Sequence, residues 1–185
     1  MKYCKRCVQP DTRPNGKFTA EGICPACNYF DNLATVDWQE RYEILQGLLS
    51  AFPRKPGQMF DCIIGVSGGK DSTRQALWVR DKLGLRPLLV CLSYPPQQVT
   101  ERGVDNISNL INLGFDVIVS APAPGVWQRL MRESFKKFTN WARSTELALF
   151  SSVPQVAIRY GISLIFWGEN PGLQVGDLAT LGRTG

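Results

Sequence analysis

The sequence predicts an α/β protein in which an open parallel sheet carries helices on both faces, preceded by a small module with four cysteines. Three features of the 185-residue chain lead to this expectation. Four short apolar runs alternate with longer amphipathic segments, as in parallel strands joined by helices. A glycine-rich turn follows the first apolar run, and two Cys-x-x-Cys pairs precede the whole series.

The apolar runs predict the order of the elements. Strands are expected over residues 60–66, 87–92, 115–120 and 162–167, and helices over 71–83, 97–113, 126–139 and 145–160. Pro154 is expected to kink or split the last helix. We therefore expect a cysteine module over 1–35, a connecting helix capped by Asp37 and a linker over 36–58, and an α/β domain over 59–185.

The composition excludes several kinds of chemistry. The chain contains no histidine, which rules out Ser-His-Asp and Cys-His catalysis and any metal site that needs an imidazole. The formal charge of +5 fits an anionic ligand without requiring nucleic acid. No apolar run is long enough to span a bilayer and no signal peptide is evident, so we expect a cytoplasmic protein without a membrane partner.

The turn from Ser67 to Ser72, Ser-Gly-Gly-Lys-Asp-Ser, is the most informative motif. Two glycines let main-chain N–H groups approach a ligand at the start of a helix, and Lys70 adds a positive charge, which together favour an anion. Asp71 beside an anion indicates a bridging Mg²⁺. The spacing excludes a Walker A loop, and the alternative is an ordinary glycine turn.

The two cysteine pairs predict a metal site. Cys4, Cys7, Cys24 and Cys27 have the spacing of a structural four-cysteine Zn²⁺ knuckle, whose metal would fix a segment too poor in apolar residues to fold alone. A redox-active dithiol is the competing interpretation.

The turn also resembles the PP-loop of the ATP pyrophosphatases, which have a HUP-like α/β fold. This resemblance implies that the chain binds ATP and that its product is pyrophosphate. It further implies that Lys70 and the turn residues Ser67, Gly68, Gly69 and Ser72 contact the phosphates, while Asp71 helps to hold Mg²⁺.

Residues 3–14, 61–72 and 164–171 together resemble the N-acetyl sugar amidotransferases of lipopolysaccharide, O-antigen and nonulosonic acid biosynthesis. The resemblance implies an N-acetylated nucleotide-sugar substrate whose acetamido group becomes an acetamidino group. ATP would adenylate the amide oxygen, and ammonia would then displace AMP. A separate glutaminase subunit is the implied source of ammonia, because a chain without histidine has no Cys-His glutaminase.

Two alternatives remain. The knuckle and the turn also resemble the PP-loop enzymes that 2-thiolate tRNA, but those need further cysteines near the nucleotide. Cys62 and Cys91 are expected to be buried in strands, so neither sulfur transfer nor a nucleic-acid partner is expected. The resemblance to the sugar amidotransferases also implies a further strand and further substrate-binding segments, so we expect the 59–185 domain to be truncated at its C terminus. The second alternative is therefore an inactive nucleotide-binding fragment.

Three further site residues are expected at the carboxyl ends of the strands, where open α/β sheets bind ligands. Glu169 would hold Mg²⁺ or orient the acceptor and, with Lys70 and Asp71, completes the expected catalytic set. Gly168 and Ser93 would line the nucleotide site, Ser93 beside the adenine.

Overall fold

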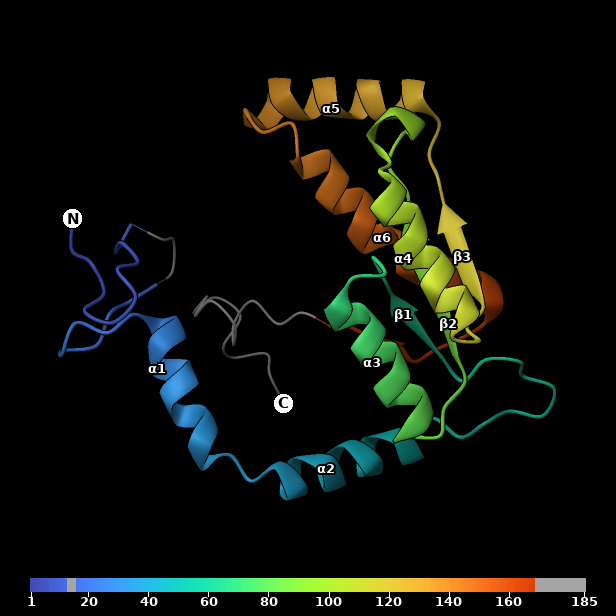
Figure 1. Ribbon diagram of the computed structural model, residues 1–185, viewed down its shortest axis with the longest axis horizontal. Coiled ribbons are helices and arrows are strands. Elements are labelled where there is room, and N and C mark those ends of the chain that lie inside the picture. The colour runs from blue at the N-terminus through green and yellow to red at the C-terminus, as the bar shows by residue number, and fades with distance from the viewer. Residues whose placement is uncertain (13–15, 169–185) are drawn as a thin grey trace. The chain divides into compact units, whose positions relative to one another are not determined.

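The computed structural model describes residues 1–12 and 16–168 (Figure 1). The chain forms two compact units, Met1–Ala51 and Phe52–Gly168. Over the described ranges, no helix has the length and apolar character needed to cross a membrane.

The N-terminal unit contains two helices and a short 3₁₀ turn. They are α1 (Pro25–Asn32), η1 (Leu33–Thr35) and α2 (Trp38–Ser50). The Asp37 carboxylate accepts hydrogen bonds from the N–H groups of Gln39 and Glu40 at 2.9 and 3.0 Å, which confirms the expected cap. Helix α1 was missed by the pattern analysis, although Cys24 followed by Pro25 is a typical helix start.

The second unit is built on a parallel four-stranded sheet with the order β3-β2-β1-β4. The strands are β1 (Cys62–Gly65), β2 (Pro87–Leu92), β3 (Val117–Ser120) and β4 (Ile165–Phe166). The register aligns Ile63 with Leu88 on one side and with Ile165 on the other. The predicted α/β fold class is confirmed, although β1, β3 and β4 are shorter than their apolar runs.

Helices cover both faces of this sheet (Figure 1). Helices α3 (Lys70–Asp81) and α4 (Glu101–Asn112) cover one face, and α6 (Arg143–Tyr160) covers the other. Helix α5 (Pro124–Phe138) contacts α6, and a 3₁₀ turn η2 (Pro96–Gln98) precedes α4. Helix α6 runs through Pro154 as one helix, so the expected split is wrong. The proline still removes the N–H that would bond the carbonyl of Phe150, one turn earlier.

Alternate residues of β1 and β2 supply two separate cores, because successive side chains of a strand point to opposite faces. Cys62 and Ile64 pack with Leu110 of α4 in the core that also contains α3 residues. Ile63 and Leu88 pack with Val153 in the core under α6. The two central strands are therefore buried on both faces, as the sequence predicted.

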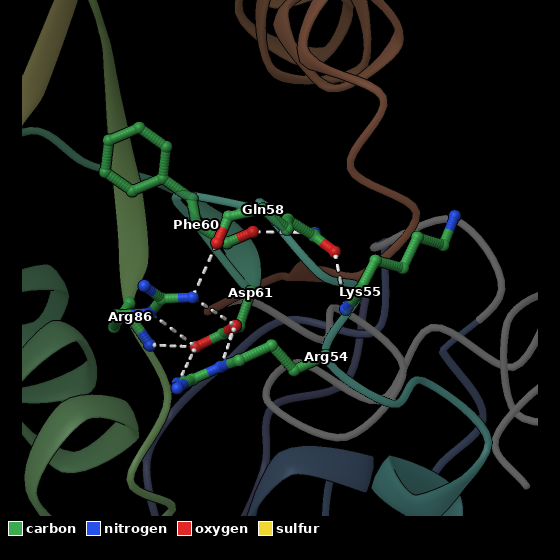
Figure 2. Close-up of polar contacts among 6 residues, drawn as sticks. All are labelled: Arg54, Lys55, Gln58, Phe60, Asp61 and Arg86. Carbon is green, nitrogen blue, oxygen red and sulfur yellow. Dashed lines mark hydrogen bonds and ion pairs between the residues drawn. The ribbon is translucent and has the colours of Figure 1, made fainter.

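The amino ends of β1 and β2 are joined through Asp61. Its carboxylate accepts hydrogen bonds from Arg54 at 2.8 and 3.0 Å and from the main-chain N–H of Arg86 at 2.8 Å. Figure 2 shows the two arginines converging on this carboxylate, and the Asp61 side chain is only 6% exposed. Burial alone would raise the pKa of the Asp61 carboxyl, but the bonds from Arg54 and Arg86 hold it well below its usual range.

Candidate functional site

The carboxyl ends of β1 and β4 flank the point where the strand order reverses. The chain proceeds from β1 to β2 and β3 on one side, and then returns to place β4 on the other side of β1. Open parallel sheets bind ligands at such a switch point. The segment Ser67–Gly69 lies there, between β1 and α3.

The segment is held in place by a close approach to α4. Gly68 has a φ of +75°, and a Cβ atom on it would lie 2.8 Å from the main-chain carbonyl of Asn106. Only glycine combines this backbone conformation with so short a contact. The tight turn that the sequence predicted at this position therefore depends on Gly68.

The start of α3 is left without a side-chain cap. Asp37 caps α2 and Thr100 caps α4, whereas the N-cap of α3 is Gly69, which has no side chain to accept a bond. The first N–H groups of a helix have no acceptor within the helix. At α3 these donors are available to an anion at the carboxyl edge of the sheet.

Two hydroxyl groups of α3 bind the carbonyls of the turn. Ser72 donates to the Gly69 carbonyl at 3.1 Å, and Thr73 donates to the Gly68 carbonyl at 3.3 Å. The N–H of Gly69 donates to the Ser67 hydroxyl at 3.3 Å. These bonds connect the turn to the first two turns of α3.

Lys70 and Asp71 are the first two residues of α3, and both side chains are exposed. They place a positive and a negative charge beside the uncapped N–H groups. A single carboxylate fits Mg²⁺, which usually takes one or two protein carboxylates together with phosphate oxygens and water. The turn thus combines hydrogen-bond donors for an anion with one carboxylate that can bind a metal ion.

Ser93 and Gly168 lie at the same edge of the sheet, after β2 and β4. The N–H of Ser93 donates to the Ser120 carbonyl at 2.8 Å, and its hydroxyl donates to the Tyr94 carbonyl at 3.1 Å. A Cβ atom on Gly168 would lie 3.0 Å from the side-chain oxygen of Gln75 in α3. Glu169, the third expected catalytic residue, lies outside the described residues.

The four cysteines of the N-terminal unit form one cluster. The sulfur atoms of Cys4, Cys7, Cys24 and Cys27 all lie within 4.8 Å of one another. The Sγ atoms of Cys7 and Cys24 are 3.6 Å apart. Tetrahedral Zn²⁺ with bonds of about 2.3 Å requires sulfur separations of about 3.8 Å, so the donor set fits this ion.

Main-chain donors stabilise charge on these sulfurs. The N–H groups of Arg6 and Cys24 donate to the Sγ of Cys4 at 3.4 and 3.2 Å. Burial would raise the pKa of Cys4, but these N–H bonds lower it to about 6. The pKa of Cys27 rises to about 12, because its bond to Cys7 and its burial favour the neutral thiol. Four thiolates at this spacing therefore need a cation.

Cys62 and Cys91 are buried in the sheet, as predicted. Burial raises the pKa of Cys62 to about 12 and also raises that of Cys91. Neither sulfur is a nucleophile near neutral pH in this environment.

The chain resembles known proteins in its fold and not in its sequence. No model of a known protein family matches the sequence, and no curated protein matches it either. A solved structure that it resembles is the NH3-dependent NAD synthetase from Campylobacter jejuni, in complex with the nitrate ion. That match has a TM-score of 0.51 and 16% sequence identity, and covers 80% of this chain and 62% of the synthetase.

Two further solved structures resemble the chain more weakly. The NMN synthetase from Francisella tularensis has a TM-score of 0.47 and 19% identity, over 74% of this chain and 56% of its own. The glutamine-dependent NAD+ synthetase from Acinetobacter baumannii, in complex with ADP, has a TM-score of 0.45 and 20% identity, over 62% of this chain and 23% of its own. The chain thus spans less than two thirds of the length of each of these structures.

The chain has the fold of the Campylobacter synthetase. The turn that resembles the PP-loop lies after the first strand of the sheet, at the edge where a parallel α/β fold holds its ligand.

Proposed function

We propose that this chain is the nucleotide-binding part of an ATP-dependent N-acetyl sugar amidotransferase in lipopolysaccharide, O-antigen or related glycan biosynthesis. The observation that supports this proposal is the turn from Ser67 to Ser72, with an uncapped helix start and Gly68 fixed against Asn106. An anion of several oxygens is the ligand that such a turn accepts.

In the first step, the amide oxygen of the acetamido group attacks the α-phosphorus of ATP. A new O–P bond forms, the bond between the α- and β-phosphates breaks, and pyrophosphate leaves with the bonding electrons. The N–H groups at the start of α3 and the Lys70 ammonium bind the negative charge that builds up on the leaving group. Asp71 would hold Mg²⁺, which neutralises phosphate charge when bound.

In the second step, ammonia attacks the carbon of the adenylyl imidate. A C–N bond forms, the C–O bond to the adenylate breaks, AMP leaves, and loss of a proton gives the neutral amidine. The Campylobacter neighbour is named as an NH3-dependent synthetase, which is a precedent for ammonia on this fold. We propose that a separate glutaminase subunit supplies the ammonia.

The four-cysteine cluster has a structural role in this proposal. A closed site with four sulfur ligands leaves no open position for a substrate. It would fold the first part of the chain, while the chemistry stays at the turn before α3.

Pyrophosphate release by the zinc-loaded chain tests the proposal. With ATP and Mg²⁺, release should require both an N-acetylated nucleotide-sugar and ammonium, and mass spectrometry should find NH in place of the acetamido oxygen. Lys70→Gln should abolish release, whereas Lys136→Gln, at an exposed ion pair on α5, should not. Release that requires tRNA and a sulfur donor would replace this proposal with thiolation, and ATP binding without release would reduce it to a nucleotide-binding fragment.

A further inference from the structure

A hollow of about 570 Å³ opens between α3 and α4, beside the turn. Its end nearest the turn is lined by Gly68, Lys70, Thr73 and Arg74 from one side and by Asn106 and Asn109 from α4. The volume lies within the range of small-molecule sites. The turn motif does not account for this space, because Arg74, Asn106 and Asn109 fall outside it.

Two cations face the hollow without counterions. Lys70 and Arg74 are four residues apart on α3, so they share one face of the helix and lie about 6 Å apart along its axis. Neither side chain forms a hydrogen bond or an ion pair with any residue in the described part of the chain. The carboxylate of Asp81 lines the far end of the hollow, about 16 Å along the axis from Lys70, and is paired with Arg80 at 2.7 Å.

Helix α4 adds neutral donors opposite these cations. Asn106 and Asn109 are three residues apart, so both amides lie on the same face of α4. The side chain of Asn106 starts close to Gly68. A Cβ atom added to Gly68 would lie 2.8 Å from the Cβ atom of Asn106. Two cations and two amides thus line the end of the hollow nearest the turn, while Leu77, Trp78, Asp81 and Lys82 line the rest.

We propose that Arg74, on the wall of this hollow, binds the terminal phosphates of a nucleotide held at the turn and makes the site select a triphosphate chain. The proposal rests on the proposed function only in that a nucleotide binds at the turn. Side chains of a helix lean toward its N-terminus, so the Arg74 side chain can reach over the first turn of α3, toward Lys70. Its guanidinium can bind two oxygens of one phosphate, which a lysine ammonium does not do in a fixed geometry.

Calorimetric titration of the zinc-loaded chain with ATP, pyrophosphate and AMP, with Mg²⁺ present, tests this assignment. Arg74→Gln should weaken binding of ATP and pyrophosphate by about tenfold or more and leave AMP binding within about twofold. Arg74→Lys should recover only part of the loss. Arg102→Gln removes an exposed arginine of α4 that does not line the hollow, and it should change none of the three affinities.

A second variant tests the hollow from its other wall. Asn109→Leu keeps the charge of the protein and replaces a donor with an apolar group, so it should also weaken pyrophosphate binding more than AMP binding. If wild-type protein binds ATP through Lys70 but both variants keep the ratio of ATP to AMP affinity, the hollow is not the phosphate site and only this inference falls. If ATP and pyrophosphate do not bind the wild type, or bind equally well to Lys70→Gln, the proposed function falls as well.

Discussion

Gly68 and Asn106 meet so closely that a Cβ atom on the glycine would lie 2.8 Å from the main-chain carbon and oxygen of the asparagine. These residues come from different connections of the sheet, one after β1 and the other in α4. The contact fixes the turn against a helix that the Ser67–Ser72 motif does not include. The position of the phosphate donors therefore depends on α4 as well as on the motif.

Gly68→Ala should weaken nucleotide binding without unfolding the sheet. Alanine disfavours a φ of +75° and its methyl group would collide with the main chain of Asn106, so the turn must move. We expect ATP affinity, measured by calorimetry, to fall by about tenfold or more.

Gly84→Ala is the matched control, because Gly84 has a φ of +65° but nothing within 4 Å of its added Cβ atom. That substitution should cost about 1 kcal/mol of unfolding free energy from backbone strain and leave ATP affinity unchanged. Equal losses of affinity in both variants would mean that the contact with Asn106 has no role in binding.

Asp61→Asn should destabilise the second unit. The asparagine cannot accept all the bonds that Arg54 and Arg86 make to the buried carboxylate, and hydrogen bonds to a charged group contribute more than neutral ones. We expect a loss of about 1–3 kcal/mol in the free energy of unfolding at pH 7, measured in urea. ATP affinity should stay unchanged, because Asp61 precedes β1 and the turn follows it.

The free energy of unfolding should depend on pH through the carboxylate of Asp61. Its pKa is lower in the folded chain than in the unfolded chain, so its stabilisation is present above the unfolded value of about 4 and is lost as the pH falls below it. The difference in stability between wild type and Asp61→Asn should therefore shrink in acid. Glu133→Gln, which removes an exposed partner of Lys136, should show little effect at any pH, and an Asp61 difference that grows in acid would contradict the assignment.

The periodicity of apolar residues predicted the sheet and its helices, because burial on both faces leaves continuous runs in the sequence. It overestimated strand lengths: Phe60 and Ile162 are buried, but they lie in the core outside β1 and β4. An apolar run in the sequence indicates which residues are buried. It does not indicate which of them form hydrogen bonds with a neighbouring strand. The interruption by Pro154 was also overestimated, because packing of Val153 and Val156 holds α6 against the sheet on both sides of it.

The motif located the turn, but it did not reveal what surrounds it. Thr73 follows the motif directly and Arg74 lies four residues after Lys70, so a search for hydroxyls and cations at helical spacing would have found both. Asn106 gives no such signal. Its contact with Gly68 arises because α3 and α4 pack on the same face of the sheet, and only the tertiary fold brings these residues together.

Zinc content should depend on each of the four clustered cysteines. The purified chain should contain about one Zn²⁺, and Cys24→Ser should lose it, because a structural site needs all four thiolates. Elemental analysis measures the metal. Limited proteolysis should then cleave the first part of the chain in Cys24→Ser, while Phe52–Gly168 stays protected.

Cys91→Ala is the control for that experiment, since it removes a buried thiol of the sheet and none of the cluster. It should retain the metal. A wild-type chain that holds no zinc but forms disulfides between the clustered cysteines in a reducing buffer would support a redox dithiol instead.

The buried thiols of the sheet should be unreactive in the folded protein. Burial raises the pKa of Cys62 to about 12, so almost none of it is thiolate at pH 8, and a thiol needs to be a thiolate to react. Removal of zinc should unfold the first part of the chain and expose its thiols, so iodoacetamide should then label the four clustered cysteines and spare Cys62 and Cys91. Full labelling of all six should appear only in denaturant, with mass spectrometry counting the adducts. Rapid labelling of Cys91, near the carboxyl end of β2, would mean that a sulfur atom is accessible at the edge that holds the nucleotide site, and sulfur transfer would then become the stronger function.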